Sequence, residues 1–193
     1  MEIKDRYLAR AAKRSRIKSA VKNFLWEGIK AVRKLIMITT GIGGVQVFEG
    51  SLAFRVKRNG IWYNFGTVSH KVITTAFAEF VVDQLQTETS VFGDFKWHQI
   101  GTGSTAEGAA QTALVTPVET VTAGSQTEDS SKVYKSIASI AITAARALRE
   151  HGIFNNETPA SGTMMDRTLF DLINLDNGDT YEATYKLTVS DNT

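Results

Sequence analysis

The sequence predicts a mainly β protein: an antiparallel β-sandwich-like domain with a basic N-terminal α-helical arm and one short packed helix. Apolar residues first recur at helical spacing, as on one face of a helix. Many short β-prone runs, separated by Gly and Asn turns, then follow, which is typical of a sandwich. Charge divides at the same place. We therefore expect two parts, a basic helical arm over residues 1–40 and a β-rich domain over residues 41–193.

The N-terminal arm is expected to be helical over residues 5–36. From Val21 onward its apolar residues follow the spacing i, i+3, i+4, i+7 that marks one buried helix face. Gly28 weakens the middle of this helix by ~1 kcal/mol relative to Ala. Gly41–Gly44 is expected to be a joint between arm and body. The apolar stripe contains Tyr7, Leu8, Ala11, Ile17, Val21, Phe24, Leu25, Ile29, Val32, Leu35 and Ile36.

The charge of the chain is strongly divided. Residues 1–40 contain 11 Lys and Arg against 3 Asp and Glu, whereas residues 41–193 contain 11 against 17. The net charges are thus +8 and −6. A basic arm on an acidic body favours binding to an acidic partner surface, and also head-to-tail contact between copies.

The first half of the body is expected to begin with strands at Val45–Phe48 and Leu52–Lys57. An Asn-Gly pair at 59–60 then predicts a hairpin turn, with Ile61–Phe65 as the return strand. The apolar period changes at Thr74–Leu85, which indicates a short helix packed on a sheet.

The second half is expected to contain further short strands and the clearest strand pattern of the chain. In the last strand apolar and polar residues alternate from Tyr181 to Val189, so that one face is buried and the other is wet. Residues 144–150 are ambiguous between helix and strand. The expected elements are strands at Phe95–Ile100, Val118–Val121, Val133–Ile142, Met164–Leu172 and Thr180–Val189, a helical turn at Thr112–Val115, and a polar loop at Ala123–Ser131.

The sequence offers no recognisable catalytic or metal signature. The absence of Cys excludes disulfides, thiolate metal sites and a cysteine nucleophile. His70, His98 and His151 lack a second ligand at i+3 or i+4, so we expect structural histidines and neither a metal nor a cofactor. The chain is therefore predicted not to be an enzyme. The enzyme alternative would require a fold that brings its scattered carboxylates together in a pocket. No run of residues is long and apolar enough for a membrane span.

Two loops resemble ligand sites superficially. Gly101–Thr105 lacks the Lys of a phosphate-binding loop and is expected to be a tight loop whose glycines adopt positive φ. Asp176–Asp179 has the residue types of a calcium site, but its Gly comes too early for an EF-hand. A hairpin turn with side-chain to backbone hydrogen bonds explains it better.

The basic arm is the strongest functional feature of the sequence. It can cover the core of its own domain, lie on a neighbouring subunit, bind nucleic-acid phosphates, or lie on an anionic membrane surface. Contact with another subunit is the leading interpretation. The residues expected to bind a partner are Lys13, Arg14, Lys18, Lys22, Phe24, Leu25, Trp26, Ile29 and Arg33.

Several segments of the body together resemble a known group of proteins. In order they are Phe95–Ala106 with its Ile-Gly-Thr-Gly-Ser-Thr loop, Gln111–Leu114, Glu150–Phe154, Gly162–Phe170 and Leu175–Val189. This order is similar to that of a widespread set of virion proteins of tailed bacteriophages, and covers about half of the chain. The resemblance implies a β-sandwich-like virion component without catalytic activity. The arm lies outside the pattern.

From the resemblance and the arm together, we expect a capsid decoration (cement) protein that stabilises the head shell. Its partners would be the major capsid protein or other virion proteins, and it would be a homo-oligomer, with a trimer possible and Val21–Ile36 as a candidate seam. It would be located in the virion and assembled in the host cytoplasm. The alternatives are a tail, neck or baseplate component and a nucleic-acid-binding protein that uses the basic arm.

Overall fold

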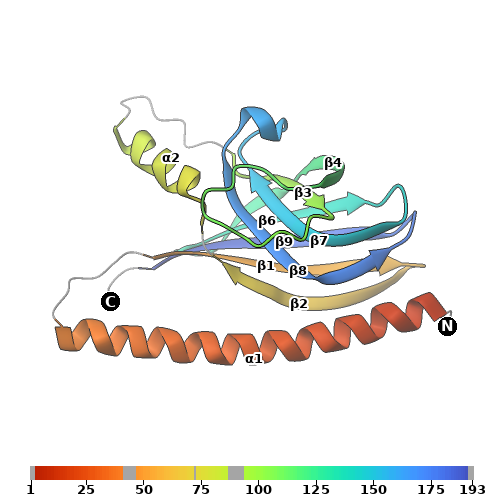
Figure 1. The fold of residues 1–193 in the computed structure, drawn as a ribbon, viewed down its shortest axis with the longest axis horizontal. Helices are drawn as coiled ribbons and strands as arrows, with labels where there is room; N and C mark the ends of the chain where they lie inside the picture. Colours follow the sequence, from red (N-terminus) through yellow and green to blue (C-terminus); the bar gives the residue numbers. More distant parts are fainter. Residues whose placement is uncertain (1–2, 41–46, 72, 87–93, 191–193) are drawn as a thin grey trace.

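The computed structural model describes residues 3–40, 47–71, 73–86 and 94–190 and shows two antiparallel sheets with a long helix beside them (Figure 1). The expected fold class, mainly β with an N-terminal helix and one short helix, is confirmed. In chain order the elements are α1 (Ile3–Thr40), β1 (Val47–Arg58), β2 (Ile61–Lys71), α2 (Thr75–Gln86), β3 (Trp97–Gly101), β4 (Pro117–Ala123), β5 (Ser125–Ser130), β6 (Val133–Ala141), β7 (Arg146–Phe154), a 3-10 turn (Pro159–Ser161), β8 (Met164–Leu175) and β9 (Thr180–Ser190).

The two sheets pack as a sandwich. The larger has the strand order β2-β1-β9-β6-β5, and the smaller has the order β4-β3-β7-β8. The edge strands β2 and β8 contact each other, and both also contact α1. Helix α1 therefore runs along the side of the sandwich where these two edges meet, and it protects them from pairing with another strand.

Strand β9 shows how the alternating sequence builds the core. Tyr181, Ala183, Tyr185 and Leu187 are all buried, as their period of two predicted. Strand β9 lies between β1 and β6, so its buried face sits at the centre of the larger sheet.

The β1–β2 hairpin confirms the expected Asn-Gly turn. Arg58 pairs with Ile61, and the two turn residues Asn59 and Gly60 have φ of 50° and 78°. Positive φ at both central residues is the requirement that an Asn-Gly pair meets. The expected helix at Thr74–Leu85 is also confirmed, as α2.

Two local predictions were wrong. The expected loop at Ala123–Ser131 contains strand β5. Every residue of this strand is exposed and polar, so its sequence has no apolar alternation that would predict a strand. Residues 112–115 form no helical turn, because the amide N–H groups that follow Leu114 are bound by a carboxylate from β7. The ambiguous segment at 144–150 belongs largely to strand β7.

The turn at Asp176–Asp179 exists, but it is not a hairpin. It connects β8 of the smaller sheet to β9 of the larger sheet. The Asp179 side chain accepts a hydrogen bond from the Asp176 amide at 2.9 Å, and Gly178 has a φ of 90°. The expected side-chain to backbone bonding is therefore present in a turn that switches sheets.

The first half of α1 packs on the body through a face that the expected apolar stripe included only in part, at Leu8 and Ala11. Leu8 and Ala12 belong to the main core cluster, together with Phe54 and Phe170. The Ser15 hydroxyl donates to the carbonyl of Phe65 at 2.8 Å. The predicted joint at Gly41–Gly44 lies outside the described residues.

The expected buried stripe from Val21 onward is wrong for its described members. Val21, Phe24 and Leu25 are exposed, as is Ile17 one turn before them. Apart from Leu8, the buried face consists of small residues such as Ala12 and Ser19, which fit close to a sheet edge. Their low hydrophobicity does not mark them as buried in the sequence. Within the described residues, no helix combines the length and apolar character that crossing a bilayer requires.

Candidate functional site

Helix α1 has two opposite faces that follow the same spacing. The face turned to the body contains Leu8, Ala12, Ser15 and Ser19. The residue nine positions after each of these is, in the same order, Ile17, Val21, Phe24 and Gly28. Nine residues are 2.5 turns of an α-helix. The second set therefore lies on the side of α1 that points away from the sandwich.

The outer face is apolar and open to solvent. Ile17, Val21, Phe24 and Leu25 are exposed by 58%, 55%, 79% and 57% respectively. Contiguous exposed apolar residues of this kind mark binding surfaces in soluble proteins. We call these four residues the outer stripe.

The residues expected to bind a partner divide among three places. Phe24 and Leu25 lie on the outer stripe, and Lys13 is exposed nearby on α1. Trp26, Ile29 and Arg33 lie on α1, but their side chains are outside the described part of the structure. Arg14, Lys18 and Lys22 line a groove between α1 and the body.

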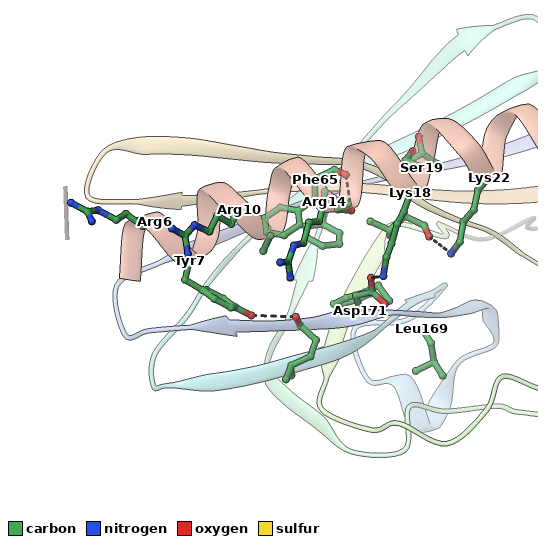
Figure 2. A pocket seen from close by; sticks show the side chains of 17 residues that line it. Arg6, Tyr7, Arg10, Arg14, Lys18, Ser19, Lys22, Phe65, Leu169 and Asp171 are labelled. Carbon is green, nitrogen blue, oxygen red and sulfur yellow. Dashed lines mark hydrogen bonds and ion pairs between the residues drawn. The ribbon is translucent and has the colours of Figure 1, made fainter. Parts of the chain in front are cut away.

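This groove contains a row of cations that sequence reasoning only partly identified. Its volume is about 770 Å³, and five basic residues line it at every fourth position of α1: Arg6, Arg10, Arg14, Lys18 and Lys22. Arg6 and Arg10 were missed, although the i+4 spacing that places them in this row is visible in the sequence. Figure 2 shows Tyr7, Arg14 and Lys18 pointing from the helix toward the opposite wall.

The opposite wall is formed mainly by β8. Lys18 forms an ion pair with Asp171, and the Tyr7 hydroxyl donates to the carbonyl of Leu172 at 3.4 Å (Figure 2). Lys22 Nζ lies 3.4 Å from the carbonyl oxygen of Val68. Within the described residues, Arg6, Arg10 and Arg14 have no carboxylate at ion-pair distance.

Most of the segments that carry the phage resemblance, though not Leu175–Val189, meet around one buried carboxylate. Glu150 of β7 accepts hydrogen bonds from the amides of Gly103, Val115 and Thr116, at 3.0, 3.1 and 2.8 Å. Burial alone would raise the pKa of Glu150. The Thr116 and Val115 amides and Arg167 outweigh that effect and lower it.

Arg167 of β8 extends the same network to the loop. Its Nη1 donates to the carbonyl of Thr105 at 3.1 Å and to the side chain of Gln111 at 3.0 Å. The residues between β3 and β4 are thus fixed to the smaller sheet by one buried ion pair. Within the resembling segments, Gly103, Gln111, Glu150 and Arg167 therefore fix the loop.

The two glycines of that loop serve a purpose other than the expected positive φ. Positive φ occurs at Gly60, Gly66 and Gly178, and neither Gly101 nor Gly103 shares it. A Cβ on Gly103 would lie 2.5 Å from Oε1 of Glu150, and one on Gly101 would meet the same oxygen. These positions lack side chains because the carboxylate approaches the backbone.

No family model, no curated protein and no solved structure matches the chain. Function is therefore inferred from side chains and their geometry, since a β-sandwich by itself supports many functions.

Among the residues that the structure describes, one arrangement, a buried histidine pair, resembles catalytic chemistry. His98 Nδ1 lies 2.9 Å from His151 Nε2, and His98 Nε2 lies 2.8 Å from Ser136 Oγ. All three side chains are fully buried, so no substrate can reach them. Burial lowers the pKa of His98 to about 3 and that of His151 well below its usual value. The pair is a neutral part of the core.

The acidic turn between β8 and β9 is neutralised from within. Arg58 Nε lies 2.9 Å from Asp179 Oδ1, and Arg58 Nη2 lies 3.1 Å from Asp176 Oδ2. The guanidinium thus occupies the space between the carboxylates that a cation would need. Among the described residues, no group of three or more His, Asp and Glu is arranged to hold a metal ion. The side chain of His70 lies outside the described part.

Proposed function

We propose that this protein is a structural component of a tailed-phage virion: a non-enzymatic capsid decoration protein that attaches to the head shell through α1. The observation that carries the proposal is the outer stripe, an apolar surface on the face of α1 opposite the one that packs on the body. The resemblance of the body to phage virion proteins suggests the assembly to which the stripe binds.

The stripe suits attachment because α1 is already fixed to the sandwich. Leu8 and Ala12 hold the helix in place, so little conformational freedom remains to be lost when a partner covers Phe24 and Val21. Complete burial of one such side chain contributes about 1.5–3 kcal/mol. A modest contact, repeated by the symmetry of a shell, would stabilise the shell as a whole.

The test is co-sedimentation with separated phage heads and tails. The native chain is compared with Val21→Asp/Phe24→Asp, which places two charges on the outer stripe. Val82→Asp is the matched control, because Val82 is a helical valine on α2 with nearly the same exposure, 54% against 55% for Val21. Deleting residues 1–40 is a poorer test, since it also removes Leu8 and Ala12 from the core.

We expect the native chain and Val82→Asp to sediment with heads and the double variant to stay in solution. Binding to tails alone would overturn the decoration role in favour of a tail, neck or baseplate component. Equal head binding by all three proteins would show that the outer stripe is not the attachment surface. Self-association that only the double variant loses would assign the stripe to contact between copies.

A further inference from the structure

We propose that the groove between α1 and β8 binds an extended acidic segment of a partner protein, with carboxylates at alternate positions. The inference rests on the proposed function only in its choice of a protein partner. It concerns a different surface from the outer stripe, because the groove lies on the flank of α1 between the helix and the sandwich (Figure 2).

The spacing of the cations carries the proposal. Residues four apart on an α-helix are about 6 Å apart along its axis. In an extended strand, side chains on one face recur every second residue, at about 6.6 Å. Each step of four residues also turns the row by about 40° around the helix axis, so only neighbouring cations of the row face one ligand. Arg10, Arg14 and Lys18, which span about 12 Å, thus match three alternate carboxylates in roughly five extended residues.

The opposite wall suits the other face of such a segment. Val68 of β2 is half-buried, and Leu169 and Leu172 of β8 line the groove across from the helix. If the bound segment points its carboxylates toward α1, the side chains between those carboxylates point the opposite way, toward this apolar wall. The preferred ligand therefore alternates acidic and apolar residues.

A nucleic acid fits the groove less well. Phe54, Phe65 and Phe170 line it but are almost fully buried, so they offer no face on which bases can stack. The wall across from the cations is apolar, whereas strand-tracking grooves are basic along the backbone path.

Asp171 already occupies one position that the ligand would take. Its carboxylate pairs with Lys18 across the groove, and its side chain is 72% exposed. An incoming carboxylate must displace this pair. Asp171→Asn should therefore raise affinity, by up to about fivefold, the usual limit for an exposed ion pair.

The experiment measures binding of a fluorescein-labelled peptide of four Glu-Val repeats by fluorescence anisotropy. A peptide of the same composition, four Glu followed by four Val, controls for charge alone. Arg10→Glu/Arg14→Glu is compared with Lys13→Glu/Arg16→Glu, which changes charge equally on the same helix at exposed residues outside the groove. Arg14→Gln serves as a milder second variant, and thermal unfolding verifies that each protein is folded.

We expect the alternating peptide to bind the native chain and the groove variant to lose at least tenfold in affinity. Lys13→Glu/Arg16→Glu should change by less than about threefold. Equal losses in both double variants, or equal binding of the block peptide, would overturn the inference in favour of unspecific charge attraction. Tighter groove-dependent binding of a thymidine oligonucleotide would reassign the groove to nucleic acid.

The two proposals fail separately. Val21→Asp/Phe24→Asp should bind the alternating peptide normally even though it no longer binds heads. If heads bind none of the proteins while the peptide still depends on Arg10 and Arg14, the virion assignment fails and the acidic-segment site stands.

Discussion

Glu150 and Arg167 form an ion pair inside the sandwich, with Arg167 Nε 2.8 Å from Glu150 Oε2 and both side chains shielded from solvent. The pair is stable there because the carboxylate also accepts three backbone hydrogen bonds, which compensate for its loss of hydration. It joins β7, β8 and the segment between β3 and β4. Its residues come from four distant places in the sequence.

Glu150→Gln is expected to destabilise the protein by about 3 kcal/mol or more, because it leaves the Arg167 charge buried without a counter-ion. Urea unfolding measures the effect. Glu128→Gln on the exposed strand β5 is the control and should change the free energy of unfolding by less than about 0.5 kcal/mol. A loss below 1 kcal/mol for Glu150→Gln would contradict this role of the pair.

Gly103→Ala is expected to destabilise by about 2 kcal/mol or more, since its Cβ would lie 2.5 Å from Glu150 Oε1 and 2.7 Å from Val115 Cβ. Gly108→Ala in the same loop is the matched control, because nothing lies within 4 Å of its Cβ. That change should be neutral or slightly stabilising in thermal unfolding. Equal effects of the two substitutions would refute the close approach of the carboxylate.

Acidification from pH 7.5 to 5 is expected to lower the free energy of unfolding through the buried histidine pair. In the unfolded chain His98 takes up a proton below about pH 6.5, whereas in the folded chain its pKa is about 3. Stability is therefore lost as pH falls from 6.5 toward 3, by about 2 kcal/mol at pH 5 from His98 alone. His151, whose pKa is also lowered, adds in the same direction.

Denaturant unfolding at the two pH values checks this dependence, with His98→Gln as the comparison. The variant should lose less stability than the native chain between pH 7.5 and 5. Glu119, Asp129 and Glu150 stay ionised in that window, because their pKa values are lowered. Identical pH profiles of the two proteins would exclude the histidine pair as the cause.

Local patterns account for what the sequence predicted well. The alternation in β9, the Asn-Gly turn before β2 and the helical period of α2 each lie within one element and report its own environment. Strand β5 has no buried face, so its sequence contains no alternation. The Glu150 network joins residues up to 64 positions apart (Gly103 to Arg167), which no local pattern reveals.

Helix α1 shows a different limit. Bulky apolar residues predicted its buried face, but Ala12, Ser15 and Ser19 pack on the sandwich because the helix lies close to strand β2. The bulky residues face outward, where no part of the described chain covers them. Sequence periodicity identified an apolar face correctly and could not tell whether it belongs to the core or to a partner.

The two faces of α1 give a final prediction in the form of a matched pair. Leu8→Ala is expected to destabilise the protein by about 2–5 kcal/mol, since Leu8 is fully buried in the main core cluster. Phe24→Ala, on the outer stripe, should change the free energy of unfolding by less than about 0.5 kcal/mol. Urea unfolding of both variants measures the difference. If Phe24→Ala destabilised the protein more than Leu8→Ala, the outer stripe would be the side of α1 that faces the core. The attachment surface would then lie elsewhere. The expected order would instead mean that Phe24 has no role in the stability of the isolated chain, so that a loss of head binding in a Phe24 variant could be assigned to the surface itself.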